Sequence, residues 1–254
     1  MTSGPPLVAV AHGSRDPRSA ATIDALLAVL RERHRDLDVR TAFLDLSAPR
    51  LADVLAAIHD EGHPEVVVAP LLLGSAYHAR VDVPGALSRA AQRHPRLRVR
   101  VTDVLGPDPR LESAALHRLI QAGADPTDAS LGVVLAGAGS SHRPANLAVA
   151  AVARRWTRTT RWSGALAAFA AAARPDVPTA VAALRARGAR HIALGSWFLA
   201  PGLLPDRVTA AMRDAAPGAL LAAPLGPDPF VADVIASRYQ EALADLRELP
   251  VPVA

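Results

Sequence analysis

Two histidines follow apolar segments that have the length and composition of buried strands. His12 comes directly after residues 7–11, and His78 comes shortly after residues 65–73. Neutral imidazoles bind borderline divalent metals such as Fe²⁺, Co²⁺ and Ni²⁺ and leave other coordination positions open. They also accept protons near neutral pH. The pair therefore indicates metal binding combined with proton transfer.

Short apolar segments alternate along the chain with segments in which apolar residues recur at helical spacing, as at Ile23, Leu26, Leu27 and Leu30. Apolar strands that alternate with helices predict parallel sheets covered on both faces. The expected strands are 7–11, 38–46, 65–73 and 96–106, then 131–136, 160–167, 191–199 and 219–226. We therefore predict an α/β protein with two similar Rossmann-like domains, each a four-stranded parallel sheet flanked by helices, facing a central cleft.

Ligands of open parallel sheets bind outside the carboxyl ends of the strands. His12 and His78 both follow such ends. If the first and third strands are neighbours, both imidazoles can face one crevice.

An internal repeat relates the two halves. The pentapeptide LGPDP occurs at residues 105–109 and 225–229. Gly62 and Gly188 lie 126 residues apart, and so do Gly13 and Gly139. Gly, Pro and Asp cluster at residues 121–130, which predicts a boundary there and domains at 1–124 and 125–254.

The two histidines have no counterparts in the second half. The position equivalent to His12 is Ala138, and the position equivalent to His78 is Leu204. A purely structural role would be expected in both copies. The asymmetry therefore indicates that the two histidines act as a pair.

Composition excludes several classes of site. The chain of 254 residues has no cysteine, so thiolate metal sites and thiol nucleophiles are ruled out. All 28 basic residues are arginine, and the net charge of +4 suits an acidic small molecule better than nucleic acid. The N-terminus does not resemble a signal peptide, and the alanine-rich segments are too short to span a membrane. We expect a cytoplasmic protein that binds neither nucleic acid nor membrane.

The segments VAHGSRDPRS, VAPLLLGSAYHARVDVP and LGPDP resemble motifs of the class II chelatases, in particular the two-half, CbiX/SirB-type sirohydrochlorin chelatases. The resemblance implies a lyase that inserts Fe²⁺ or Co²⁺, or else Ni²⁺, into a tetrapyrrole without ATP or an organic cofactor. It assigns His12 and His78 as metal ligands and proton acceptors. Members often carry an acidic residue where this chain has Val81, so acidic assistance is left to Asp82 or another group. His142 is a further candidate.

Sirohydrochlorin is a flat macrocycle with eight carboxylates, which calls for an apolar slot with arginine and backbone donors at its rim. Ser14, Arg15 and Arg80 flank the two histidines, and Ser75 and Tyr77 belong to the same loop as His78. We expect these five residues to contact the substrate. The sequence leaves open the metal, the pathway (siroheme or cobalamin) and whether the protein is a monomer or a homodimer.

The sequence lacks the motifs of several other α/β functions. The segment GAGSSHR lacks the third glycine of a dinucleotide-binding fingerprint, and no G-x-S-x-G elbow of an α/β-hydrolase is present. A histidine phosphatase would need arginine where Ala11 stands. The remaining alternative is a non-catalytic metal or tetrapyrrole carrier, which would bind its ligands without accelerating metal insertion.

Overall fold

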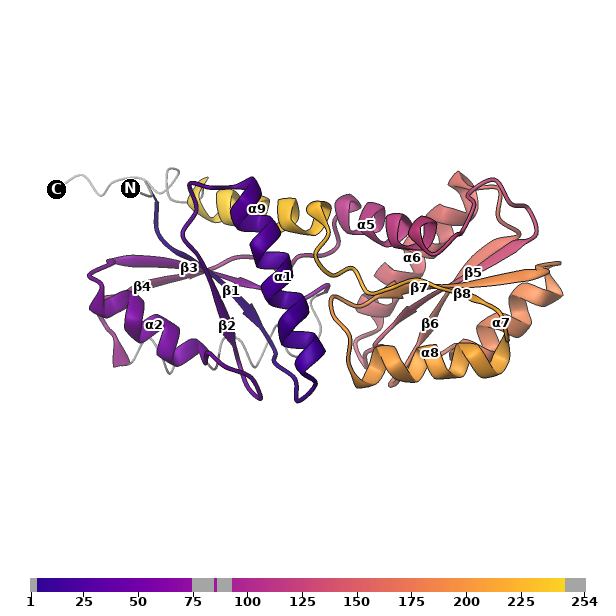
Figure 1. Ribbon diagram of the computed structural model, residues 1–254, viewed down its shortest axis with the longest axis horizontal. Coiled ribbons are helices and arrows are strands. Elements are labelled where there is room, and N and C mark those ends of the chain that lie inside the picture. Colours follow the sequence, from indigo (N-terminus) through magenta and orange to yellow (C-terminus); the bar gives the residue numbers. More distant parts are fainter. Residues whose placement is uncertain (1–3, 75–84, 86–92, 245–254) are drawn as a thin grey trace. The chain divides into compact units, whose positions relative to one another are not determined.

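The computed structural model describes residues 4–74, 85 and 93–244, and the chain forms two compact units (Figure 1). Unit 1 consists of Met1–Asp108 together with Pro227–Ala254, and unit 2 consists of Pro109–Gly226. Each unit contains one four-stranded sheet in which every pair of neighbouring strands is parallel. The predicted α/β class with two similar parallel sheets is confirmed.

The sheet of unit 1 has the strand order β2-β1-β3-β4, so the first and third strands are neighbours as the site requires. Its strands are β1 (Leu7–Ala11), β2 (Val39–Phe43), β3 (Glu65–Pro70) and β4 (Arg98–Val101). Helix α2 (Leu51–Asp60) covers one face, and α1 (Pro17–Arg33) and α9 (Pro229–Ala244) cover the other.

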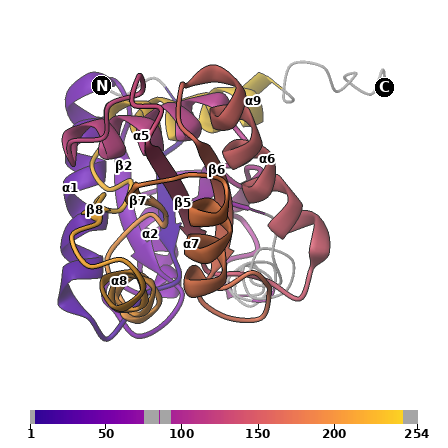
Figure 2. The same cartoon turned by 90° about the vertical axis from the view of Figure 1, so that its right-hand side faces the viewer.

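The sheet of unit 2 repeats this order as β6-β5-β7-β8. Its strands are β5 (Leu131–Gly137), β6 (Gly164–Phe169), β7 (His191–Trp197) and β8 (Leu220–Leu221). Helices α5 (Pro109–Gln121) and α6 (Arg143–Thr159) lie on one side of the sheet, and α7 (Val177–Ala186) and α8 (Leu203–Ala215) lie on the other (Figure 2).

The central strands are apolar throughout because both of their faces are covered. Every residue of β1 and of β5 is buried. Side chains alternate along a strand, and Val8 and Val10 pack in the cluster that α2 closes. Each large apolar side chain that is fully buried stabilises the fold by about 1.5–3 kcal/mol.

The last helix of each sequence half packs on the sheet of the other half. Helix α5 contacts β7 of unit 2, where Leu119 lies against Gly195. Helix α9 contacts α1 and β3 of unit 1, and Arg33 of α1 pairs with Asp233 of α9 at 2.9 Å. The compact units therefore do not coincide with the sequential division at 1–124 and 125–254. An apolar stripe along a helix predicts that this side of the helix is buried. Because the hydrophobic effect has no preferred direction, the stripe does not show which of the two sheets buries it.

The two LGPDP segments lie where the chain passes between the units, and an arginine holds each of them. Arg238 of α9 donates to the carbonyl oxygens of Val104 (3.0 Å) and Leu105 (3.1 Å). Arg118 of α5 donates twice to the carbonyl oxygen of Leu225, at 3.0 and 2.8 Å. Both arginines and both leucines are related by the 120-residue offset of the motif. The repeat thus encodes a matched pair of side-chain-to-backbone contacts.

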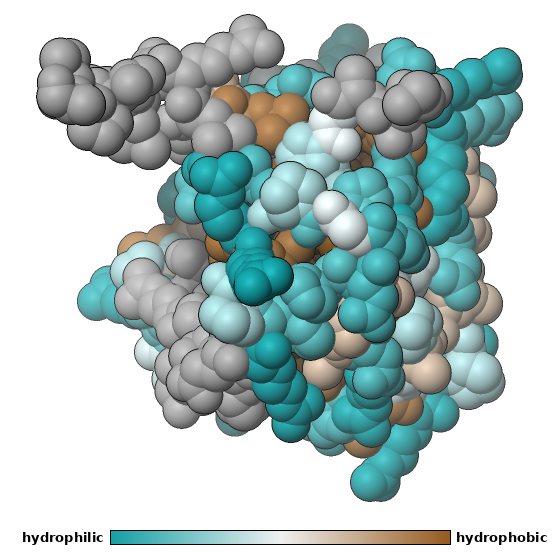
Figure 3. Space-filling model, turned by 90° about the vertical axis from the view of Figure 1, so that its left-hand side faces the viewer, coloured by the Kyte–Doolittle hydropathy of each residue, from teal (hydrophilic) through white to brown (hydrophobic). Residues whose placement is uncertain are grey.

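The face of unit 1 seen in Figure 3 is mainly hydrophilic, with apolar residues in small separate areas. Such scattered apolar residues are normal for a protein surface. Among the helices that the structure describes, none combines the length and apolar character needed to cross a bilayer.

We predict that Arg118→Met destabilises the protein by about 1–3 kcal/mol, because it leaves the buried Leu225 carbonyl without its donor. Arg207→Met is the control, since Arg207 is exposed on α8 and should change stability by less than about 0.5 kcal/mol. Urea unfolding followed by circular dichroism measures both. Equal unfolding midpoints for the two variants would contradict the role assigned to Arg118.

Candidate functional site

The candidate site is built at the carboxyl edge of the sheet in unit 1. Val10 of β1 is paired with Pro70 of β3, and the Leu71 N–H donates to the Val10 carbonyl oxygen at 2.8 Å. The segments that leave β1 and β3 therefore start side by side. His12 is exposed immediately after β1.

Several predicted site residues belong to the segment that continues from β3. His78, Ser75, Tyr77, Arg80 and Asp82 all lie outside the described residues. Their roles stay predictions from the sequence motif.

The turn that carries His12 is fixed by backbone contacts with the segment after β2. The N–H of Asp45 donates to the carbonyl oxygen of His12 at 2.9 Å, and the N–H of Leu44 donates to that of Ala11 at 3.0 Å. Gly13 has a φ of +96°, and a Cβ atom there would lie 1.6 Å from the Asp45 carbonyl oxygen. Only glycine permits this approach, so Gly13 sets the position of His12 relative to Asp45.

Ser14 continues the same attachment. Its N–H donates to the Ser47 hydroxyl at 3.1 Å, and that hydroxyl donates to the Ser14 carbonyl oxygen at 3.0 Å. The Ser14 hydroxyl accepts from the N–H of Asp16, which is the N-cap of α1. Ser14 therefore has a structural role in the turn besides its predicted contact with substrate. Arg15 is exposed beside it.

Asp45 is the acidic group that sequence reasoning missed. Its carboxylate accepts from the Leu46 N–H at 2.8 Å and from the Arg50 guanidinium at 2.6 Å. These two hydrogen bonds, with a smaller effect of nearby His12, hold the pKa of Asp45 below its ordinary value. The exposed Asp45 carboxylate is therefore negatively charged at neutral pH.

The repeat contained a signal for Asp45. In unit 2 the N–H of Ala171 donates to the carbonyl oxygen of Ala138 at 3.0 Å, and a Cβ on Gly139 would lie 1.9 Å from the Ala171 oxygen. The backbone of the turn is thus the same in both units. Asp45 is replaced by Ala171 at the offset at which His12 is replaced by Ala138. The acid and the imidazole are present in one copy only.

His142 lies in unit 2 as the N-cap residue of α6, and its N–H donates to the Ser140 hydroxyl at 3.0 Å. It occupies the position of Asp16 in the repeat. Within the described part of the chain no group of three or more His, Cys, Asp or Glu side chains is placed to hold a metal ion.

The family model CbiX matches residues 6–122 and again residues 132–242. The chain belongs to the CbiX family. The two matched segments are the two halves of the repeat, and together they span nearly all of this CbiX-family chain.

Curated relatives carry two names. The sirohydrochlorin ferrochelatase of Bacillus subtilis is 26% identical over 240 residues, which cover 93% of this chain and 91% of that protein. The sirohydrochlorin ferrochelatase of Priestia megaterium is 30% identical over 135 residues, 52% of this chain and 49% of that protein, so the match spans about half its length. The sirohydrochlorin cobaltochelatase of the same organism is 24% identical and covers 78% of this chain and 65% of that protein.

A solved structure with the same fold is SirB from Bacillus subtilis with Fe³⁺. It superposes with a TM-score of 0.77 over 95% of this chain and 96% of that chain, at 24% identity. The likeness extends over both units and shows that this chain has the fold of that protein.

We predict that Gly13→Ala destabilises the protein far more than Gly62→Ala. Both glycines have positive φ, but a Cβ on Gly62 would meet nothing within 4 Å. Gly62→Ala should cost about 1–2 kcal/mol for the backbone conformation alone. Gly13→Ala should cost at least about 2 kcal/mol more, because the backbone of the turn must shift. Thermal and urea unfolding compare the two, and similar losses would show that the close approach to Asp45 is not a constraint.

Proposed function

We propose that this chain is a sirohydrochlorin chelatase, a lyase that inserts Fe²⁺ or Co²⁺ as a substrate into the tetrapyrrole without ATP. Its family membership and the names of its curated relatives support this reaction. The observation that carries it is the exposed turn on which the backbone of His12 is hydrogen-bonded to that of Asp45, within a scaffold whose second copy keeps the turn and lacks both side chains.

The reaction sets two requirements. The divalent ion must be held loosely enough to be transferred, and the two protons on the pyrrole nitrogens must leave as the metal–nitrogen bonds form. We assign His12 as a metal ligand and proton acceptor, with His78 as the second imidazole. The net change is M²⁺ plus the ring with two N–H groups giving the metallated ring plus two protons, which imidazole takes up and passes to solvent.

Asp45 contributes an ionised carboxylate, paired with Arg50, on the segment that is hydrogen-bonded to the His12 turn. Its carboxylate is already engaged by Arg50 and the Leu46 N–H, which hold it in one orientation. We assign it to attract and orient the cation and not to accept protons, because its lowered pKa makes it a poor base.

The macrocycle requires cations for its carboxylates. Arg15 is exposed next to the His12 turn and is the described residue that we assign to this role. From the sequence motif we also assign to substrate binding Arg80, Ser75 and Tyr77. We assign Ser14 to the same role through its backbone groups and its hydroxyl in the turn. The site chemistry does not select iron over cobalt, since imidazole and carboxylate accept both ions.

We predict that His12→Ala lowers the rate of metal insertion by at least about 100-fold while the far-ultraviolet circular dichroism and the unfolding midpoint stay unchanged, because His12 is exposed. The assay mixes protein, sirohydrochlorin and Co²⁺ without oxygen and follows the absorbance of the ring. His191→Ala, at an exposed histidine of unit 2 that has no assigned role, should keep the parent rate. A His12→Ala variant with the parent rate would remove His12 from the mechanism, and a parent protein that binds the ring without accelerating insertion would be a carrier.

We predict that Asp45→Asn raises the KM for Co²⁺ roughly tenfold, because the amide oxygen can still accept from Leu46 but the negative charge is gone. A group with a lowered pKa keeps its charge until the pH falls below its ordinary range. The ratio of kcat/KM between parent and variant should therefore be constant from about pH 5.5 to 8. A ratio that approaches one at the acidic end would show that Asp45 itself titrates there.

A further inference from the structure

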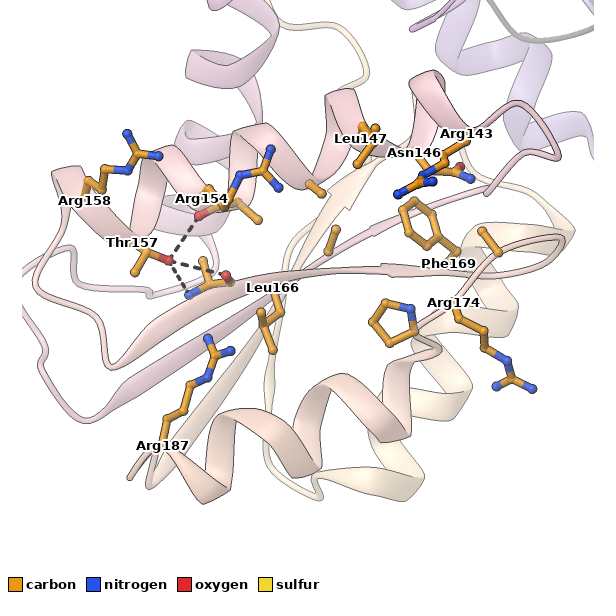
Figure 4. Close-up of a pocket in the computed structure, with 16 residues that line it drawn as sticks. Arg143, Asn146, Leu147, Arg154, Thr157, Arg158, Leu166, Phe169, Arg174 and Arg187 are labelled. Carbon is orange, nitrogen blue, oxygen red and sulfur yellow. Dashed lines mark hydrogen bonds between the residues drawn. The ribbon is translucent and has the colours of Figure 1, made fainter.

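Unit 2 contains a cavity of about 630 Å³ along the edge strand β6 (Figure 4). Helix α6 forms one side, and the segment 173–175 and Arg187 at the end of α7 form the other. Every described residue that lines the cavity falls between 143 and 187, within unit 2, whereas His12 belongs to unit 1. Its volume is within the range of small-molecule sites, about 300–1,000 Å³.

Small side chains produce the cavity. Helices α1 and α6 are both 17 residues long and are related by the 126-residue offset, so their side chains can be compared position by position. Ala153 lines the cavity at the position where unit 1 has the fully buried Leu27. Ala165 on β6 likewise replaces Val39. The floor is thus apolar but not filled, and Phe169 closes one end of it.

Arginines surround this floor. The cavity is lined by Arg143, Arg154 and Arg158 of α6 and by Arg174 and Arg187 opposite them, and none of its described lining residues is acidic. In the repeat, Arg158 replaces Glu32 and Arg187 replaces Glu61, so unit 2 has cations where unit 1 has anions.

Most of this charge is not neutralised. Arg174 pairs with Asp176. Within the described residues no carboxylate forms an ion pair with Arg143, Arg154, Arg158 or Arg187. A ring of like charges around one apolar cavity favours a ligand that brings several anionic groups to its edge.

A peptide strand does not suit the cavity. The outer edge of β6 is closed at two points, where the Ala165 N–H donates to the Thr157 hydroxyl at 2.9 Å and the Phe169 N–H donates to the Pro175 carbonyl oxygen at 2.9 Å. An added strand would have to displace both bonds. A nucleotide does not suit it either, because its phosphates cluster at one end while the arginines stand on both sides of the floor.

We propose that this groove of unit 2 binds a polycarboxylated tetrapyrrole ring, as a second position for the ring besides the His12 site. The choice of ring rests on the proposed function. The apolar floor takes part of the macrocycle face, and the arginines on both sides take the peripheral carboxylates. Metal-free substrate and metallated product share this chemistry, so each is tested separately.

The test is a fluorescence and absorbance titration of the protein with sirohydrochlorin, repeated with its iron-loaded form. Arg154→Glu combined with Arg158→Glu reverses the charge of the groove. The matched control is Arg207→Glu combined with Arg213→Glu, which makes the same charge change on exposed positions of α8 in the same unit. Circular dichroism checks that both double variants are folded.

We expect two rings bound per chain for the parent and the control, and one for the groove variant, with the groove affinity falling at least about tenfold. The form of the ring whose binding is lost identifies substrate or product. Unchanged stoichiometry in the groove variant, equal losses in the control, or displacement of the ring by equimolar ATP would overturn the proposal.

Metal insertion is measured separately on the same samples. If the parent protein inserts no metal but loses one bound ring on mutation of the groove, the second site is supported and the proposed chelatase function is rejected. If the parent protein inserts metal but binds only one ring, the chelatase function is supported and the second site is rejected.

Discussion

The described part of the candidate site depends on one close backbone approach. Gly13 brings the segment after β1 against the carbonyl oxygen of Asp45, and the Asp45 N–H donates to the carbonyl oxygen of His12. Because these contacts involve backbone atoms, they hold the backbone of His12 and that of Asp45 together whatever the side chains of the two segments do. The carboxylate keeps its charge because Leu46 and Arg50 stabilise the ionised form. This exposed turn is where we propose that the protein receives a divalent cation and passes it on.

The duplicated fold acts as an internal comparison. Unit 2 has the same strand order and the same turn, with Gly139 in the place of Gly13. Its turn carries alanine at both chemical positions, and its edge strand instead borders an apolar groove lined with arginine. One backbone thus supports two kinds of surface, for which we propose a metal ion in unit 1 and a polycarboxylate in unit 2. Both are ligands that a metal-inserting enzyme of the CbiX family has to handle.

The exchange of α5 and α9 has a structural consequence for each unit. Each sheet is completed by a helix from the other half of the sequence, and the arginine of that helix, Arg118 or Arg238, binds the backbone of an LGPDP segment. Neither half of the sequence can therefore form its compact unit from its own residues alone. This explains why the pentapeptide occurs twice with a matching arginine 13 residues after its leucine.

The sequence by itself determined the sheets, their parallel pairing and the position of His12, because burial on both faces requires apolar strands and a tight turn requires glycine. It also suggested the family through short motifs. Only the tertiary structure decided that the Asp45 segment lies against the His12 turn, that α5 and α9 change places, and that arginines of α6 and of the segments flanking α7 line one cavity. These depend on contacts between segments far apart in the chain. Local periodicity records that a side chain is covered or exposed, and it does not record which distant group it meets.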